Sequence, residues 1–270
     1  MKYFLLICYS CFVITAKSQT AEETYAAGWK YVLQQQTDTG LSLINRAAYF
    51  NPALLSNKSC FALGDTLFFQ SKFEWADIYY SKGYEQFYID SINDETILKM
   101  ASSSYFIQKY ETSLKYLKKS KNKYSYNYNY YMFLDLWSLR NYDSCLFYLQ
   151  KIVPDSVYYN KVKKRIQHID KISPQKALIM SLFLPGLGQA YAHDYKNAIN
   201  SLALNTLFGY AMVRTFTRYS WVEMVMGVLP WWERYYRGGA IHAKDIAQKY
   251  KTEKARKLLL EVNGYLMGKL

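Results

Sequence analysis

Residues 108–119, QKYETSLKYLKK, and residues 140–151, RNYDSCLFYLQK, repeat one pattern of residue types at an offset of 32 positions. In both stretches a tyrosine is followed by an acid, a hydroxyl residue, a small residue and a leucine, and soon after by Tyr-Leu. Residues 71–80, SKFEWADIYY, repeat the aromatic–acid pair and place a small residue three positions after the aromatic. Repeats at this period are typical of stacked helical pairs, so the sequence predicts an all-α chain that contains a helical solenoid.

Small and aromatic residues extend this pattern over four units, at about 21–54, 57–90, 94–124 and 126–158. The first unit carries Gly28, Tyr31, Gly40, Ala47 and Pro52, and the second carries Leu63, Gly64, Leu67, Phe73, Ala76, Tyr80 and Gly83. This spacing resembles the tetratricopeptide repeat, a helix-turn-helix unit of about 34 residues. The third and fourth units depart from the family, because Ala101 and Phe133 replace its first glycine. A generic helical bundle without repeat symmetry is the alternative.

The position of each cysteine within its unit bears on whether the two can form a disulfide. Cys60 falls on the first helix of the second unit and Cys145 on the second helix of the fourth. Packed helices lie about 8–10 Å apart, whereas a disulfide needs Cα atoms within about 7 Å. We expect no bridge between Cys60 and Cys145, and we expect both thiols to act as small core residues.

The first eighteen residues have the layout of a secretory signal peptide. Met1-Lys2 gives a basic start, an apolar run follows, and Ala16-Lys17-Ser18 offers small residues for cleavage. We expect residues 1–18 to be removed and the chain to be exported, with an uncleaved N-terminal anchor as the alternative. Residues 19–158 then form the repeats. Residues 159–173 form an amphipathic capping or linker helix, since Val162, Ile166 and Ile169 share one face.

The composition changes after Ser173-Pro174, which are expected to cap a helix and open its first turn. Two uncharged runs, 177–192 and 198–213, and a largely apolar run, 219–232, follow. Their small residues, and the tryptophans and tyrosines at the end of the last run, are typical of membrane helices. We expect residues 174–243 to form a hydrophobic helical, transmembrane domain and residues 244–270 a basic C-terminal helix or tail. Each run is short for a span, so a soluble helical core is the alternative.

Several residues of this region form a recognisable motif: Pro185, Gly186, Gly188, Gln189 and Tyr191, followed further on by Gly238 and Gly239. The motif is similar to a C-terminal membrane domain of unknown function in Gram-negative envelope proteins, and distantly to the two-transmembrane domain family. That resemblance implies a membrane domain, not an activity. His193 stands where the second family usually has glycine. We expect Pro185 and Gly186 to break a helix and Gly188 to allow close packing.

The sequence offers little for catalysis. Three histidines and four cysteines show no metal-ligand spacing, and Gly186-x-Gly188 lacks the Gly-Lys-Ser/Thr of a phosphate loop. Glu223 is the one ionisable residue inside an apolar run, and we expect it to pair with Arg218 or Arg214. We therefore predict no enzymatic activity, no cofactor and no metal. Pro185, Gly186, Gly188, Gln189, Tyr191, Glu223, Gly238 and Gly239 are the candidate motif residues.

Charge and location together predict the partners. The net charge is +13, and residues 176–270 hold 13 Lys and Arg against 6 Asp and Glu. Export argues against nucleic acid, and anionic lipid is the simpler partner. We predict an envelope adaptor, anchored in a membrane with its repeats in the periplasm, that binds a partner protein or peptide in the repeat groove. The alternatives are a membrane-active module that handles lipid or a small solute under control of the repeats, and a soluble periplasmic helical binding protein.

Overall fold

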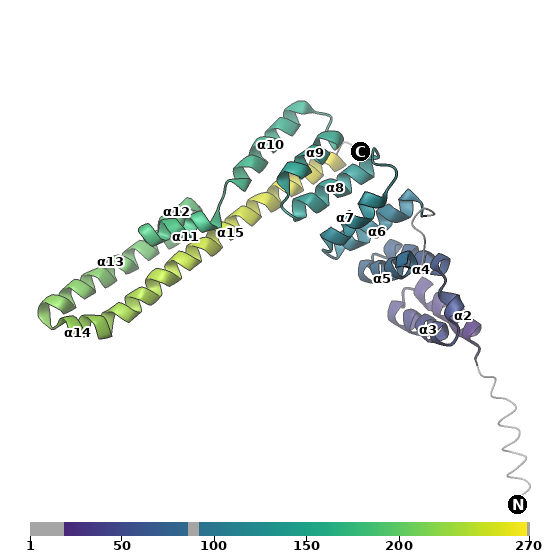
Figure 1. Ribbon diagram of the computed structural model, residues 1–270, viewed down its shortest axis with the longest axis horizontal. Coiled ribbons are helices and arrows are strands. Elements are labelled where there is room, and N and C mark those ends of the chain that lie inside the picture. The colour runs from purple at the N-terminus through teal and green to yellow at the C-terminus, as the bar shows by residue number, and fades with distance from the viewer. Residues whose placement is uncertain (1–18, 86–91, 269–270) are drawn as a thin grey trace, which may run out of the picture. The chain divides into compact units, whose positions relative to one another are not determined.

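The computed structural model describes residues 19–85 and 92–268, and these residues form helices without any strand (Figure 1). The chain divides into two compact units, Met1–Ile152 and Val153–Leu270. The all-α prediction is confirmed. The predicted signal peptide at residues 1–18 lies outside the described residues.

Unit 1 consists of helices that pair in chain order (Figure 1). Each pair packs on the next, which gives a repeat-like fold compatible with tetratricopeptide-like units. The pairs are α2 (Ala21–Leu33) with α3 (Thr37–Phe50), α4 (Asn57–Phe69) with α5 (Phe73–Glu85), α6 (Asp94–Phe106) with α7 (Tyr110–Lys119), and α8 (Tyr126–Ser138) with α9 (Tyr142–Ile152). A short 3₁₀ turn, η1 (Pro52–Leu55), follows α3.

A shared helix start sets the register of the four pairs. The first helix of every pair begins after a residue whose side chain accepts a backbone N–H three positions on. Such N-caps satisfy donors that a helix start leaves open. The four caps are Thr20, Ser56, Asn93 and Ser125.

The turn inside each pair repeats as well. Fifteen residues after each cap comes a residue with φ near +60°, namely Gln35, Ser71, Gln108 and Arg140. In each case the next backbone N–H donates to a carbonyl five residues back. This left-handed C-terminal motif ends a helix, and its recurrence at one distance from the cap defines the repeat.

Small residues bring the two helices of a pair together where the sequence predicts it. A Cβ on Gly28 would lie 2.8 Å from the Gly40 carbonyl oxygen, and a Cβ on Gly40 would lie 2.7 Å from the Gly28 oxygen. Gly64 faces the ring of Tyr80, which its Cβ would meet at 2.5 Å. Cys60 and Cys145 are buried and unbridged on α4 and α9, the helices that the repeat register indicates.

Buried carboxylates link neighbouring helical pairs of unit 1. Asp77 on α5 accepts the Ser104 hydroxyl at 2.6 Å, and Lys109 Nζ pairs with its other oxygen at 2.8 Å. Asp135 on α8 accepts the Ser113 hydroxyl at 2.6 Å, but its Oδ1 has no hydrogen-bond partner among the described residues. Burial raises the pKa of Asp135 to about 7.

Unit 2 is organised around its last helix, α15 (Leu229–Met267). α10 (Ser156–Asp170), α11 (Pro174–Phe183) and α12 (Leu187–Tyr191) pack against it. α13 (Tyr195–Arg218) runs back alongside it and is joined to it through α14 (Trp221–Glu223) and a π-helical turn, η3 (Met224–Val228) (Figure 1). α15 continues unbroken through residues 243 and 244.

Two stretches of α15 supply its buried contacts. Ala240, Ala243 and Ala247 are buried on one side of the helix, where their small side chains allow close packing. Leu258, Val262 and Leu266 are buried nearer its C-terminus, where Arg165 of α10 also pairs with Glu261 at 2.6 Å. Ser173 caps α11 and Pro174 opens its first turn, as the sequence predicts.

The transmembrane prediction for residues 174–243 is not met. Among the described residues, no helix combines the length and the apolar character needed to cross a bilayer. α13 has 24 residues, but Asn197, Asn200 and Asn205 interrupt its apolar sequence. Within this region Gly186, Gly188, Ala240 and Ala243 serve close packing around α12 and α15 instead.

Asp135 predicts a pH dependence of stability. Because its folded pKa is raised, the folded state keeps a proton that the unfolded state has lost between about pH 4 and the folded pKa. The contribution of Asp135 to the free energy of unfolding should therefore fall as pH rises through this window and level off above about pH 7. Asp135→Asn keeps an acceptor for Ser113 and cannot ionise.

Urea unfolding at pH 5 and pH 8 measures this effect. We expect the loss of stability between the two pH values to be smaller in Asp135→Asn than in wild type. The matched control is Asp143→Asn, since Asp143 is exposed on α9, and it should keep the wild-type difference. Equal pH differences in wild type and Asp135→Asn would contradict this account.

Candidate functional site

The predicted motif forms a buried hydrogen-bond network where α11, α12 and α15 meet. The backbone N–H of Gly188 donates to Ser181 Oγ at 2.9 Å, and Ser181 Oγ donates to Gln189 Oε1 at 2.9 Å. Gln189 Nε2 in turn donates to the Gly239 carbonyl oxygen at 2.9 Å. Gln189 is buried and thus fixes α12 to both neighbouring helices.

The motif glycines are required by close backbone contacts. Gly186 adopts φ +95° and caps α12, and a Cβ there would lie 2.4 Å from the Ala198 carbonyl oxygen. A Cβ on Gly188 would lie 1.9 Å from the Ala177 carbonyl oxygen. Pro185 stands in the break between α11 and α12. The expectation that Pro185-Gly186 interrupts the helix and Gly188 permits close packing is confirmed.

Tyr191 and His193 lie at the C-terminal end of α12. The Tyr191 hydroxyl accepts the Ser173 N–H at 3.2 Å and donates to the Lys171 carbonyl at 3.4 Å, which ties α12 to the residues before α11. His193 adopts φ +61°, the conformation of the turns in unit 1. The position where the resembled family has glycine is therefore left-handed here although it carries histidine.

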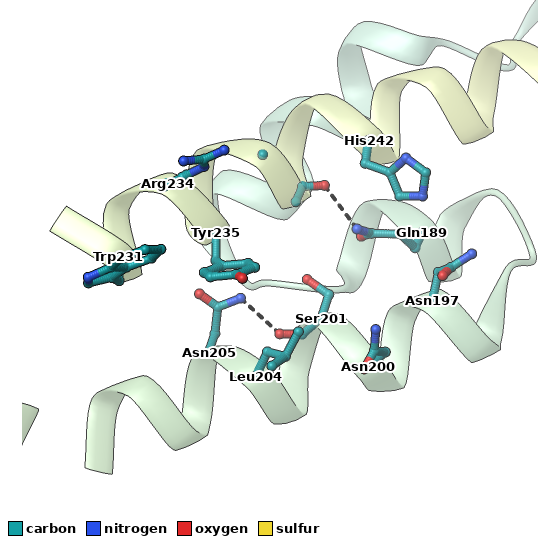
Figure 2. A pocket seen from close by; sticks show the side chains of 12 residues that line it. Gln189, Asn197, Asn200, Ser201, Leu204, Asn205, Trp231, Arg234, Tyr235 and His242 are labelled. Atoms are coloured by element: carbon teal, nitrogen blue, oxygen red, sulfur yellow. Dashed lines mark hydrogen bonds between the residues drawn. The ribbon is translucent and has the colours of Figure 1, made fainter. Parts of the chain in front are cut away.

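A pocket of about 450 Å³ opens between α13 and α15, with α12 at one end (Figure 2). On both α13 and α15 the lining positions recur at helical spacing, so one face of each helix forms a wall of the pocket. The lining residues are Gln189, Asn197, Asn200, Ser201, Leu204, Asn205, Trp231, Arg234, Tyr235, Gly238, Gly239 and His242.

Carboxamides dominate the polar lining, and no carboxylate belongs to it. Asn205 Nδ2 donates to the Ser201 carbonyl at 2.8 Å, while Asn205 Oδ1 is buried without a donor among the described residues. Asn197 donates from its side chain and its backbone to Asp194, at 2.7 Å and 3.1 Å, and these bonds lower the pKa of Asp194. The polar lining therefore consists mainly of uncharged groups, together with Arg234.

The structure brings only some of the predicted motif residues to this pocket. Gln189, Gly238 and Gly239 line it, and Pro185, Gly186 and Gly188 hold α12 in place behind it. Tyr191 does not line it. Glu223 is exposed at the hairpin end, that is, the turn from α13 to α15 formed by α14 and η3. Its backbone N–H donates to Ser220 Oγ at 3.2 Å. The expected pairing of Glu223 with Arg218 or Arg214 is wrong, since no ion pair of the described residues includes Glu223.

Sequence reasoning missed most of the pocket wall. The missed residues are Asn197, Asn200, Ser201, Leu204, Asn205, Trp231, Arg234, Tyr235 and His242. A usable signal was present, because Asn197, Ser201 and Asn205 recur at four-residue intervals on one helix face within an otherwise apolar run.

No protein-family model, curated protein or solved structure matches this chain. The comparisons therefore support neither the tetratricopeptide resemblance nor the resemblance to an envelope membrane domain. Among the described residues, no group of three or more His, Cys, Asp or Glu side chains is placed to hold a metal ion.

The glycines of unit 2 predict opposite effects of the same substitution. Gly188→Ala should destabilise the protein by roughly 1–3 kcal/mol, because the new methyl group meets a backbone oxygen that cannot move aside. Gly238→Ala should stabilise it by about 0.5–1 kcal/mol, since its Cβ meets nothing within 4 Å and alanine favours the helix. Thermal unfolding of both variants checks this, and equal midpoints for the two would refute the packing described for Gly188.

Proposed function

We propose that this protein is an exported adaptor of the cell envelope. It lies on a membrane surface through α13, the hairpin end and the first turns of α15, and it binds a partner protein or peptide through its helical repeats. The proposal assigns it no catalytic step and no cofactor. The observation that carries the membrane part is the exposure of α13.

α13 has 24 residues and only Ala198 is buried. Its exposed side chains include Ile199, Leu202, Leu207, Tyr210, Val213 and Phe216. Soluble proteins rarely expose so long an apolar surface, because each Å² of it costs about 25 cal/mol in water. A lipid surface removes this cost without requiring the helix to cross the bilayer.

The hairpin end carries the residues that suit a membrane interface. Trp221, Val222, Met226 and Trp231 are exposed on α14, η3 and the start of α15. Tryptophan favours the head-group level, where its ring is apolar and its N–H is polar. Arginines flank this end on both sides, at Arg214, Arg218, Arg234 and Arg237, and long cationic side chains can reach lipid phosphates from a half-buried helix.

The repeats supply the adaptor part of the proposal. Stacked helical pairs form extended surfaces on which proteins or peptides bind. Phe50, Phe69, Phe106 and Phe147 are exposed on α3, α4, α6 and α9. Exposed aromatic side chains on a rigid scaffold are typical anchors for a protein partner. The resemblance to tetratricopeptide repeats, whose pattern covers residues 21–158, points the same way.

The pocket of unit 2 favours a second candidate function. A cavity of about 450 Å³ with a carboxamide lining falls in the size range of small-molecule sites. A membrane-active module that handles a lipid or a small solute, with the repeats as its regulatory part, would use this cavity. The membrane-active module requires the pocket residues around Gly238 for its activity. The adaptor requires only α13 and the repeats.

Vesicle flotation tests the membrane part. Wild type should float with phosphatidylcholine vesicles, and a triple variant, Leu207→Glu with Val213→Glu and Phe216→Glu, should stay at the bottom, because charge is costly at these depths. The matched control, Leu33→Glu with Phe50→Glu and Phe69→Glu, changes equally exposed side chains of unit 1 and should float. Flotation of both triple variants alike would count against membrane attachment through α13.

Photo-crosslinking in cells tests the adaptor part. A photoreactive amino acid at Phe69, Phe106 or Phe147 should give one discrete protein adduct shared by at least two of these positions. The same group at Lys163, exposed on α10 of unit 2, is the control and should not give that adduct. Absence of a shared adduct from all three repeat positions would remove the basis for a partner on this surface.

A further inference from the structure

The pocket between α13 and α15 has no part in the adaptor function beyond the membrane contacts proposed for Trp231 and Arg234, and two glycines create its space. A Cβ on Gly238 meets no atom within 4 Å, and one on Gly239 meets Ser201 Oγ at 3.2 Å. Glycine is unfavourable inside a helix by about 0.5–1 kcal/mol relative to alanine. Two adjacent glycines in the N-terminal third of α15 thus reduce helix stability while keeping the cavity open.

One atom of the pocket wall calls for a particular ligand group. Asn205 Nδ2 is occupied by the Ser201 carbonyl, whereas Asn205 Oδ1 is buried and receives no donor from the described residues. Figure 2 shows this oxygen turned away from the Ser201 carbonyl and toward the side of Trp231 and Tyr235. An unpaired buried acceptor is costly. A ligand hydroxyl would satisfy it, whereas a phosphate or carboxylate oxygen, being an acceptor, would not.

The remaining lining fits a ring that bears several hydroxyls. Trp231 and Tyr235 stand together at one end of the cavity (Figure 2). Tyr235 stacks one face of its ring on Phe208, with ring centroids 5.3 Å apart, and its other face can receive a ligand. Carboxamides on the opposite wall can both donate to and accept from hydroxyls. Arg234 supplies a positive charge to the pocket lining. The neighbouring carboxylate, Glu233, forms its ion pair with Arg237 at 2.8 Å and not with Arg234. Arg234 is therefore open to an acidic substituent of a ligand.

We propose that this pocket binds the pyranose ring of a saccharide. The ring packs on Trp231 and Tyr235, and one of its hydroxyls donates to Asn205 Oδ1. The same chemistry is offered by a glycolipid head group and by a free glycan. Binding of a glycolipid head group rests on the proposed membrane attachment. Binding of a free glycan in the pocket does not depend on it.

Saturation-transfer NMR of the full-length protein tests the binding of free sugars. The probes are D-glucose, D-galactose and D-glucuronic acid. Wild type should transfer saturation to at least one of them. Gly238→Leu fills the cavity and Asn205→Leu removes the acceptor, so each should weaken binding roughly tenfold or more. Gly264→Leu is the matched control, because Gly264 lies on the same helix, has no atom within 4 Å of its Cβ and does not line the pocket.

Vesicle flotation identifies the source of the sugar. Digalactosyl diacylglycerol, added to phosphatidylcholine vesicles, should tighten binding of wild type and Gly264→Leu but not of Gly238→Leu if the pocket takes a glycolipid. Binding of a free sugar without this effect assigns a free glycan, which also supports the proposal. Flotation with pure phosphatidylcholine reports the membrane attachment separately.

Three results would overturn the saccharide site. One is that none of the probe sugars and no glycolipid is bound. Another is that Gly238→Leu binds sugar as wild type does. The third is that phosphatidylglycerol vesicles alone gain affinity in a Gly238-dependent way, which would assign the pocket to a phosphate head group.

Discussion

The contact between the Gly188 backbone and the Ala177 carbonyl is the constraint on which unit 2 depends. No β-carbon fits between α11 and α12 there, since it would lie 1.9 Å from the oxygen. This approach places Gln189 so that its amide joins Ser181 to the Gly239 carbonyl. The polar link fixes α15 relative to α12, and the left-handed turn at His193 then directs α13 back along α15. The pocket and the exposed face of α13 both follow from that geometry.

Unit 1 was predictable because its constraints repeat. The position twenty residues after each cap holds Gly40, Ala76, Ser113 or Cys145, a buried small residue in every unit. The third unit lacks the expected glycine at Ala101, yet its helices begin and end in register because the cap and the left-handed turn remain. The hydrogen bonds at the helix ends therefore keep the repeat in register where the packing residues differ between units.

The rest of the site could not be predicted because it depends on which helices face each other. Asn205 is one polar residue in a largely apolar run, and nothing in the local sequence places it opposite Tyr235, thirty residues later. Asn197, Asn200 and Asn205 also make α13 less apolar, and no described helix is long and apolar enough to cross a membrane. Of the motif residues located from the sequence, Gly186, Gly188, Gln189 and Tyr191 fix helices to one another. Only Gln189 and the two glycines of α15 reach the pocket.

We propose that α13 lies in lipid along its exposed apolar face. Nitroxide labels at Val213 on α13 and at Lys163 on α10, read by electron paramagnetic resonance with protein bound to phosphatidylcholine vesicles, test it most directly. If α13 lies in lipid, the label at 213 should collide mainly with oxygen, which concentrates in the bilayer. The label at 163 should collide mainly with a water-soluble nickel reagent. Water-like collision rates at both positions would contradict it.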